Sequence, residues 1–128
     1  MRLLLDTQIL LWAAIQPKKL SAPARRLLTG KEQQLAFSVV SLWEIVIKRS
    51  LGRRDFTVDA AVLRRALLEN GYEELVVRGE HVMRVSGLPA LHKDPFDRLL
   101  VAQAQVEGAV LLTSDRVLAR YGESVKPV

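Results

Sequence analysis

Cysteine is absent from this chain of 128 residues. Its absence excludes disulfide bonds, zinc sites built from thiolates and a cysteine nucleophile. No apolar run approaches the roughly 20 residues that span a bilayer. The apolar run after Arg2 is interrupted at Asp6, which leaves too short a segment for a signal peptide. We therefore expect a cytoplasmic protein that does not associate with membranes.

Several common catalytic patterns are missing as well. The two histidines, His81 and His92, do not form a His-x-His or His-x-x-x-His zinc pattern. There is no Gly-x-Ser-x-Gly sequence for a serine nucleophile and no Gly-rich phosphate loop. We interpret His92 as a loop residue rather than a ligand. Aromatic residues make up only 5% of the chain, so base stacking is not an evident binding mode; Trp12 and Trp43 are interpreted as core or interface residues.

The composition fits one folded domain, residues 1–128, with 49% hydrophobic residues to form its core. The chain carries 19 Lys and Arg against 14 Asp and Glu, a net charge of +5. If five of the acids line one pocket, the remaining surface carries 19 basic and 9 acidic groups. A basic exterior around an acidic pocket suits a polyanionic substrate, although a net charge alone also fits a merely soluble basic protein.

Strand-like and helix-like segments alternate along the chain. Continuous apolar strands separated by helices favour an α/β fold with a central, mostly parallel sheet of four to five strands, flanked by helices on both faces. The predicted strands are 2–6, 35–40, 73–77, 109–113 and an edge strand at 125–128. The predicted helices are 7–15, 21–29, 42–50, 60–70, 80–86, 95–107 and 115–121.

Four carboxylates, Asp6, Glu44, Asp97 and Asp115, lie near the predicted junctions between strands and helices. Because ligands of open α/β sheets bind beyond the carboxyl ends of the strands, these acids are expected to converge at one edge of the sheet. Such a cluster repels itself unless it holds a divalent cation. Oxygen ligands suit Mg²⁺ or Mn²⁺, so we predict that these four residues are both catalytic and metal-binding.

Helix capping is the alternative explanation for each acid taken singly. Asp6 and Asp115 precede predicted helices, Asp94-Pro95 is typical of a helix start, and Ser41-Leu42-Trp43-Glu44 matches a capping box. Capping would place each acid at the same end of the sheet, so the two explanations are compatible. Four further residues are predicted to be accessory to the site: Asp94, Thr113 and Ser114 as neighbours of the acids, and Arg98 as a brace for a carboxylate or a contact to phosphate.

The acidic stretches resemble the PIN-domain ribonucleases and, within them, the VapC-type toxins of bacterial toxin–antitoxin pairs. The stretches that carry the resemblance span nearly the whole chain: Leu4-Leu5-Asp6-Thr7, the segment from Ser38 to Ile45, the long block from His92 to Ala104, and Leu112-Thr113-Ser114-Asp115. The resemblance implies a PIN fold, Mg²⁺- or Mn²⁺-dependent cleavage of RNA, a cognate antitoxin and a homodimer. It carries the acidic roles onto Asp6, Glu44, Asp97 and Asp115, with Asp94 as an accessory acid. The chain departs from this pattern at Gln8, where relatives often have His or Asn.

Two other functions remain open from the sequence. The first is a PIN module that binds RNA or protein without cleaving it. The second is a phospho-acceptor signalling domain, which also combines a small α/β sheet with carboxylates and Mg²⁺. That design requires paired acids after the first strand, whereas only Asp6 stands there.

Overall fold

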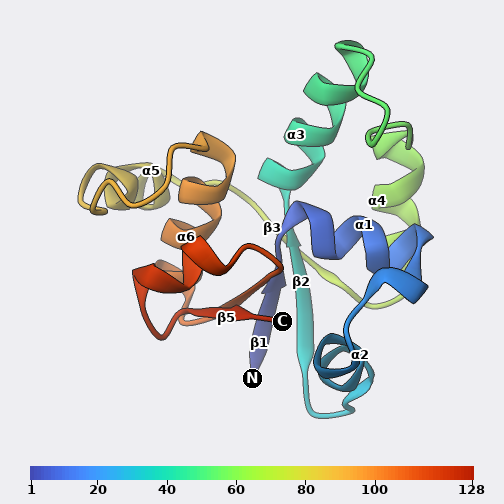
Figure 1. Cartoon of the computed structure of the whole chain (residues 1–128), viewed down its shortest axis with the longest axis horizontal. Helices are drawn as coiled ribbons and strands as arrows, with labels where there is room; N and C mark the ends of the chain where they lie inside the picture. Colours follow the sequence, from blue (N-terminus) through green and yellow to red (C-terminus); the bar gives the residue numbers. More distant parts are fainter.

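The computed structural model describes residues Met1 to Val128 as a five-stranded parallel sheet with helices on both faces (Figure 1). This confirms the predicted α/β fold, with every strand pairing parallel. The strands are β1 (Arg2–Leu5), β2 (Gln34–Ser38), β3 (Glu73–Leu75), β4 (Val110–Thr113) and β5 (Val125–Pro127). The helices are α1 (Thr7–Ile15), α2 (Ala22–Thr29), α3 (Val39–Ser50), α4 (Ala60–Glu69), α5 (Gly79–Ser86) and α6 (Pro95–Glu107), with 3-10 turns η1 (Pro17–Lys19) and η2 (Arg116–Tyr121).

The strand order β3-β2-β1-β4-β5 makes β1 the central strand. The chain builds outward from β1 to β2 and β3, then returns to place β4 and β5 on the other side of β1. The connections therefore leave in opposite directions on the two sides of β1, which opens a crevice at the carboxyl ends of β1 and β4. Ligand sites of open α/β sheets lie at such a crevice.

Both faces of the central strand are buried. Leu3 and Leu5 pack with residues of α1, α2 and α4 on one face, while Leu4 packs with residues of α6 on the other. Figure 1 shows these two groups of helices on opposite sides of the sheet. Alternate side chains of β1 therefore enter separate cores, which explains why the strand reads as an unbroken apolar run.

Helix boundaries follow local signals where capping groups are present. The side chains of Asp6, Ser21 and Asp94 cap α1, α2 and α6, as the sequence predicts. Gly108 ends α6 with a φ of 65°, in the left-handed region that glycine enters without a steric cost. None of the helices combines the length and apolar character needed to cross a membrane.

The predicted junction between the second strand and the third helix is wrong, and it bears on the site. Strand β2 ends at Ser38, whereas the prediction extended it to residue 40. Helix α3 begins at Val39 instead of residue 42, because the Ser38 hydroxyl caps it by accepting a hydrogen bond from the Val40 amide at 3.0 Å. Val39 and Val40 have high strand propensity, which the cap overrides. Ser41 consequently lies inside the helix, and the predicted capping box with Glu44 does not form. The last predicted helix is the 3-10 turn η2.

Candidate metal centre

Asp6 follows β1 directly and is held from three directions. Its backbone amide donates to the Leu112 carbonyl of β4 at 3.0 Å. Its Oδ1 accepts from the Ile9 amide at 2.8 Å, which caps α1, and its Oδ2 accepts from the Thr113 hydroxyl at 2.5 Å. The residue is only 5% exposed. Two strands and a helix therefore determine where this carboxylate lies.

Thr113, at the end of β4, connects Asp6 to Asp115. Its hydroxyl donates to Asp6 and accepts from the Asp115 amide at 3.0 Å. The Asp115 carboxylate in turn caps η2 by accepting from the Val117 amide at 2.9 Å. One buried hydroxyl thus positions the acids that follow the two strands flanking the crevice.

Replacing Thr113 with Val should lower the free energy of unfolding by about 1–3 kcal/mol, because a buried carboxylate oxygen of Asp6 loses its partner. Thr113→Ser keeps the hydroxyl and serves as the matched control. Urea unfolding at pH 7.5 measures both variants. Equal stability of the Val and Ser variants would contradict this role of the hydroxyl.

Glu44 reaches the site from the second turn of α3 rather than from the predicted strand-to-helix junction. Its Oε1 accepts from the Thr7 hydroxyl at 2.5 Å, and its Oε2 forms an ion pair with Lys48 at 2.5 Å. The residue is 5% exposed. Lys48, one helical turn further along, also lies over the Phe56 ring with its ammonium 4.8 Å from the ring centroid. The sequence analysis did not single out Lys48, although its i,i+4 spacing from Glu44 is a usable signal.

Asp94 and Asp97 enter from the start of α6. The Asp94 carboxylate caps the helix by accepting from the amides of Phe96 (2.8 Å) and Asp97 (3.2 Å). Pro95 occupies the first helical position, as predicted. Asp97 lies in the first turn, and both acids line the same pocket as Asp6 and Glu44.

His92 belongs to the site, although the sequence suggested only a loop residue. Its Nδ1 accepts from the Asp94 amide at 3.1 Å, so the proton of the neutral ring lies on Nε2. That Nε2 donates to Asp115 Oδ2 at 2.8 Å and lies 3.8 Å from Asp97 Oδ2. The sequence signal that could have placed His92 at the site is its spacing from Asp94, His92-x-Asp94, just before a capped helix.

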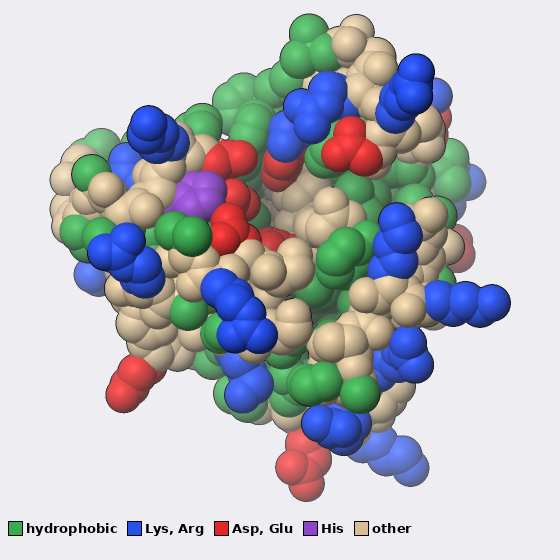
Figure 2. All heavy atoms as spheres, in the orientation of Figure 1, with side chains coloured by type: hydrophobic (Ala, Val, Ile, Leu, Met, Phe, Trp, Pro, Cys, Tyr) green, Lys and Arg blue, Asp and Glu red, His purple; other side chains and the backbone are tan.

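The acids face one pocket of about 250 Å³, which we call the acidic pocket. Figure 2 shows acidic side chains and a histidine gathered in a hollow, with Lys and Arg side chains around it. The residues that line it are Asp6, Thr7, Gln8, Glu44, Lys48, Arg53, Asp55, Phe56, Asp94, Asp97, Ser114 and Asp115. All four predicted catalytic acids are therefore brought together, with Asp94 and Ser114 beside them.

Burial and the repulsion between neighbouring carboxylates disfavour the ionised forms of Asp6 and Asp97 in the acidic pocket. Burial raises the pKa of Asp6 to about 6, with the charges of Glu44 and Asp115 adding to the effect. Burial, followed by the charges of Asp94, Asp6 and Glu44, raises the pKa of Asp97 to about 7. A positive charge that enters the pocket lowers the pKa of both carboxyls, because it stabilises their ionised forms.

The donor set fits a hard divalent cation. Ligand atoms of His92, Asp97 and Asp115 lie within 4.8 Å of one another. Because both ring nitrogens of His92 are hydrogen-bonded, the carboxylates of Asp97 and Asp115 are the ligands that this group offers. Asp6 and Glu44 face the same pocket, but in this structure their oxygens are bonded to Thr113, Thr7, Lys48 and the Ile9 amide. Carboxylate oxygens dominate the set, which favours Mg²⁺ or Mn²⁺ over softer metals.

Arg98 does not have the predicted role of bracing a carboxylate. Its guanidinium donates to the carbonyls of Val85 (3.3 Å) and Leu88 (3.2 Å), at the end of α5, and it does not line the acidic pocket. Successive residues of a helix point about 100° apart, so Asp97 and Arg98 face different neighbours. Arg98 links α6 to α5 instead.

The fold and the site together define the class of this protein: a small parallel α/β domain with a carboxylate pocket at its central crevice. A sequence model of the PIN domain matches residues 3–124, and the chain belongs to this family. The predicted PIN fold is thereby confirmed. No curated protein matches the chain in sequence.

Solved structures with the same fold include several toxin–antitoxin complexes. VapBC2 from Rickettsia felis, bound to a DNA fragment from its promoter, aligns with a TM-score of 0.73 at 18% identity, covering 99% of this chain and 98% of that one. A toxin–antitoxin complex from Klebsiella pneumoniae aligns with a TM-score of 0.63 at 18% identity, covering 96% of this chain and 94% of that one. VapBC-1 from nontypeable Haemophilus influenzae aligns with a TM-score of 0.61 at 21% identity, covering 94% of this chain and 92% of that one.

Proposed function

We propose that this protein is a Mg²⁺- or Mn²⁺-dependent endoribonuclease and the toxin of a VapC-type toxin–antitoxin pair. The observation that carries the proposal is the convergence of four carboxylates, from four separate segments, on one pocket at the crevice of a PIN fold. The structural neighbours that are toxin–antitoxin complexes support the toxin assignment.

Asp6, Asp97 and Asp115 are the residues that would hold one divalent cation, and Glu44 would help to hold a second or orient the attacking water. When bound, the cation neutralises charge on the phosphate and makes the attacking water more acidic. Thr113 and Thr7 keep the carboxylates of Asp6 and Glu44 in place through their hydroxyls. Lys48 lies beside Glu44 and supplies a positive charge within reach of a phosphate that enters the pocket.

The reaction is an in-line hydrolysis by water that does not use the RNA 2′-hydroxyl. The chain offers no pair of catalytic histidines of the kind that would activate that hydroxyl, because His81 is fully buried against Glu107 and only His92 lies at the pocket. Carboxylates therefore have to carry the acid–base and ligand roles.

An RNA cleavage assay with the purified protein tests the function. We expect cleavage in Mg²⁺ or Mn²⁺, no cleavage in EDTA, and products without a 2′,3′-cyclic phosphate. A matched substrate with a 2′-deoxynucleotide at the cut position should still be cleaved. Cleavage that persists in EDTA, or that the deoxynucleotide abolishes, would refute the mechanism. RNA that is bound but left intact in both metals would favour the non-cleaving binding module.

The proposed partners are RNA, a cognate antitoxin and a second copy of the chain. Large apolar side chains remain exposed on α3 and just after it, with Trp43 58% exposed, Val46 53% and Leu51 72%. A surface of this kind suits a protein interface. Sedimentation that shows only monomer at micromolar concentration would contradict the homodimer.

A further inference from the structure

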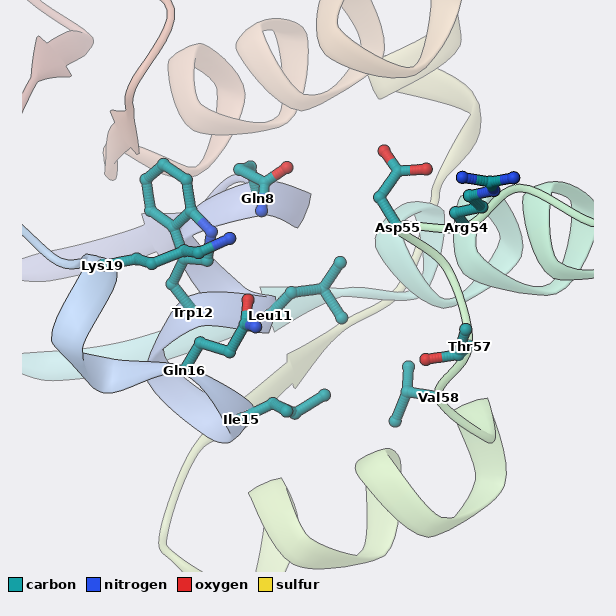
Figure 3. A pocket seen from close by; sticks show the side chains of 10 residues that line it. All are labelled: Gln8, Leu11, Trp12, Ile15, Gln16, Lys19, Arg54, Asp55, Thr57 and Val58. Carbon is teal, nitrogen blue, oxygen red and sulfur yellow. The ribbon is translucent and has the colours of Figure 1, made fainter.

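A second pocket of about 340 Å³ adjoins the acidic pocket, because Gln8 and Asp55 line both. It lies between α1 and residues 54–58, and Figure 3 shows the side chains that line it. We call it the α1 pocket. Its volume falls within the range of roughly 300–1,000 Å³ that is usual for small-ligand sites. A strand bound at the acids therefore has this neighbouring pocket within reach.

The α1 pocket has a mixed lining, in which four of the ten residues are hydrophobic and one of these, Trp12, is aromatic. Leu11 and Ile15 of α1 and Val58 supply aliphatic surface (Figure 3). Trp12 packs partly against the core on the α1 side of the sheet and also lines the pocket. Its sequence context suggested a core or interface residue, whereas its position in the pocket makes it available for stacking with a planar ligand.

Several of the polar side chains that line the α1 pocket make no side-chain bond within the chain. The side-chain amides of Gln8 and Gln16 have no hydrogen-bond partner within the chain. Lys19 and Arg54 form no ion pair, whereas the neighbouring Arg53 lies 3.6 Å from Asp55. An indole for stacking, amides that both donate and accept, and unpaired cations are together the groups that recognise a nucleobase and its phosphate.

We propose that the α1 pocket binds one nucleotide of the RNA strand next to the scissile phosphate, with Trp12 stacking on the base and Lys19 or Arg54 contacting a phosphate. The proposal rests on the proposed ribonuclease function. The carboxylates of the acidic pocket repel phosphate, so an RNA strand that enters it needs cations alongside. Lys19 and Arg54 supply such cations in the α1 pocket, which favours RNA over a peptide. Gln8, at the junction of the two pockets, is placed to contact the nucleotide that enters the acidic pocket.

Tryptophan fluorescence tests the pocket separately from cleavage. Trp12 and Trp43 are the two tryptophans, so Trp43→Phe leaves Trp12 as the sole reporter, and Trp12→Phe leaves Trp43 as the matched control. Both variants carry Asp97→Asn to prevent turnover and are titrated with AMP, GMP, CMP and UMP, and with a single-stranded RNA octamer. We expect saturable quenching of Trp12 and none of Trp43.

Binding variants complete the test. Trp12→Ala and Lys19→Ala should each raise the KM for RNA about tenfold while kcat changes little, since stacking and phosphate contacts contribute to binding along the strand. Trp12→Ala should also change the nucleotide preference at the cut. Lys31→Ala removes the same charge from the exposed turn before β2 and should leave KM unchanged.

The outcomes separate this proposal from the ribonuclease function. If RNA is cleaved but neither the mononucleotides nor the octamer quench Trp12, the nucleotide site is refuted while the ribonuclease function stands. If the nucleotides leave Trp12 unchanged and an antitoxin peptide quenches it, the pocket is a protein site and the proposal is refuted. If RNA is neither cleaved nor bound, both proposals fail.

Discussion

Asp97→Asn should reduce RNA cleavage by roughly 100-fold or more, while the metal-free protein becomes more stable. Ligands of a catalytic cation support several kcal/mol of charge stabilisation, and each 1.4 kcal/mol or so corresponds to a tenfold change in rate. Asparagine keeps the shape of the side chain and removes the charge. Because burial and the neighbouring Asp94 raise the pKa of Asp97 to about 7, removing this charge also relieves an unfavourable interaction in the folded state.

Asp59→Asn is the matched control for this variant. Asp59 also caps a helix, α4, but it lies on the surface outside the acidic pocket, and asparagine caps helices as well as aspartate does. Initial cleavage rates and urea unfolding at pH 8 measure both variants. If Asp97→Asn keeps its activity, or if it loses stability together with activity, the assignment of Asp97 as a charged metal ligand is wrong.

Divalent metal binding should weaken steeply as the pH falls through the range of the two raised pKa values. Asp6 and Asp97, with pKa values of about 6 and 7, must both lose their protons for the ion to bind, so protons compete with the metal. Below pH 6 the affinity for Mn²⁺ should fall about 100-fold per pH unit, the limit for two competing protons. Calorimetric titrations between pH 5 and pH 8 measure it, and a pH-independent affinity would contradict the participation of these two acids.

Asp6 and Asp97 also contribute to the pH dependence of stability without metal. Each carboxyl has a higher pKa in the folded state than in the unfolded chain, so the folded state binds more protons between about pH 4 and pH 7. Their contribution to the free energy of unfolding therefore decreases as the pH rises through this window, by about 1.4 kcal/mol for each unit of pKa difference. Above pH 7, Mg²⁺ should restore that stability, and thermal unfolding with and without Mg²⁺ detects the difference.

Much of the fold was predictable because its signals are local. The bounds predicted for α1 and α6 agree with the structure at 7–15 and 95–107, since the caps Asp6 and Asp94 and the terminator Gly108 act within one turn of the helix they bound. The positions of Asp6 and Asp115 followed from their strands, because a parallel sheet brings the carboxyl ends of its strands to one edge. Asp97 follows no strand: it lies in the first turn of α6, after α5 and a loop, and the packing of α6 on the sheet brings it to the same edge.

The remaining site residues depend on contacts between distant segments. Glu44 reaches the pocket because α3 starts three residues earlier than its sequence suggests and lies against Thr7 of α1. His92 bonds Asp115, 23 residues further along the chain. The segment with Asp55 and Phe56 carries no motif, yet it forms one side of the acidic pocket.

By itself, the sequence determined a parallel α/β fold and the delivery of acids to one edge of its sheet, because strand periodicity and helix capping are encoded in short windows of residues. Only the tertiary structure decided which groups complete that edge: Thr113 between two acids, Lys48 beside Glu44, His92 against Asp115, and Arg98 turned away toward α5. The physical reason is that a side chain's partners depend on how helices pack across the sheet. The raised pKa values of Asp6 and Asp97 likewise arise from burial and neighbouring charges that exist only in the folded chain.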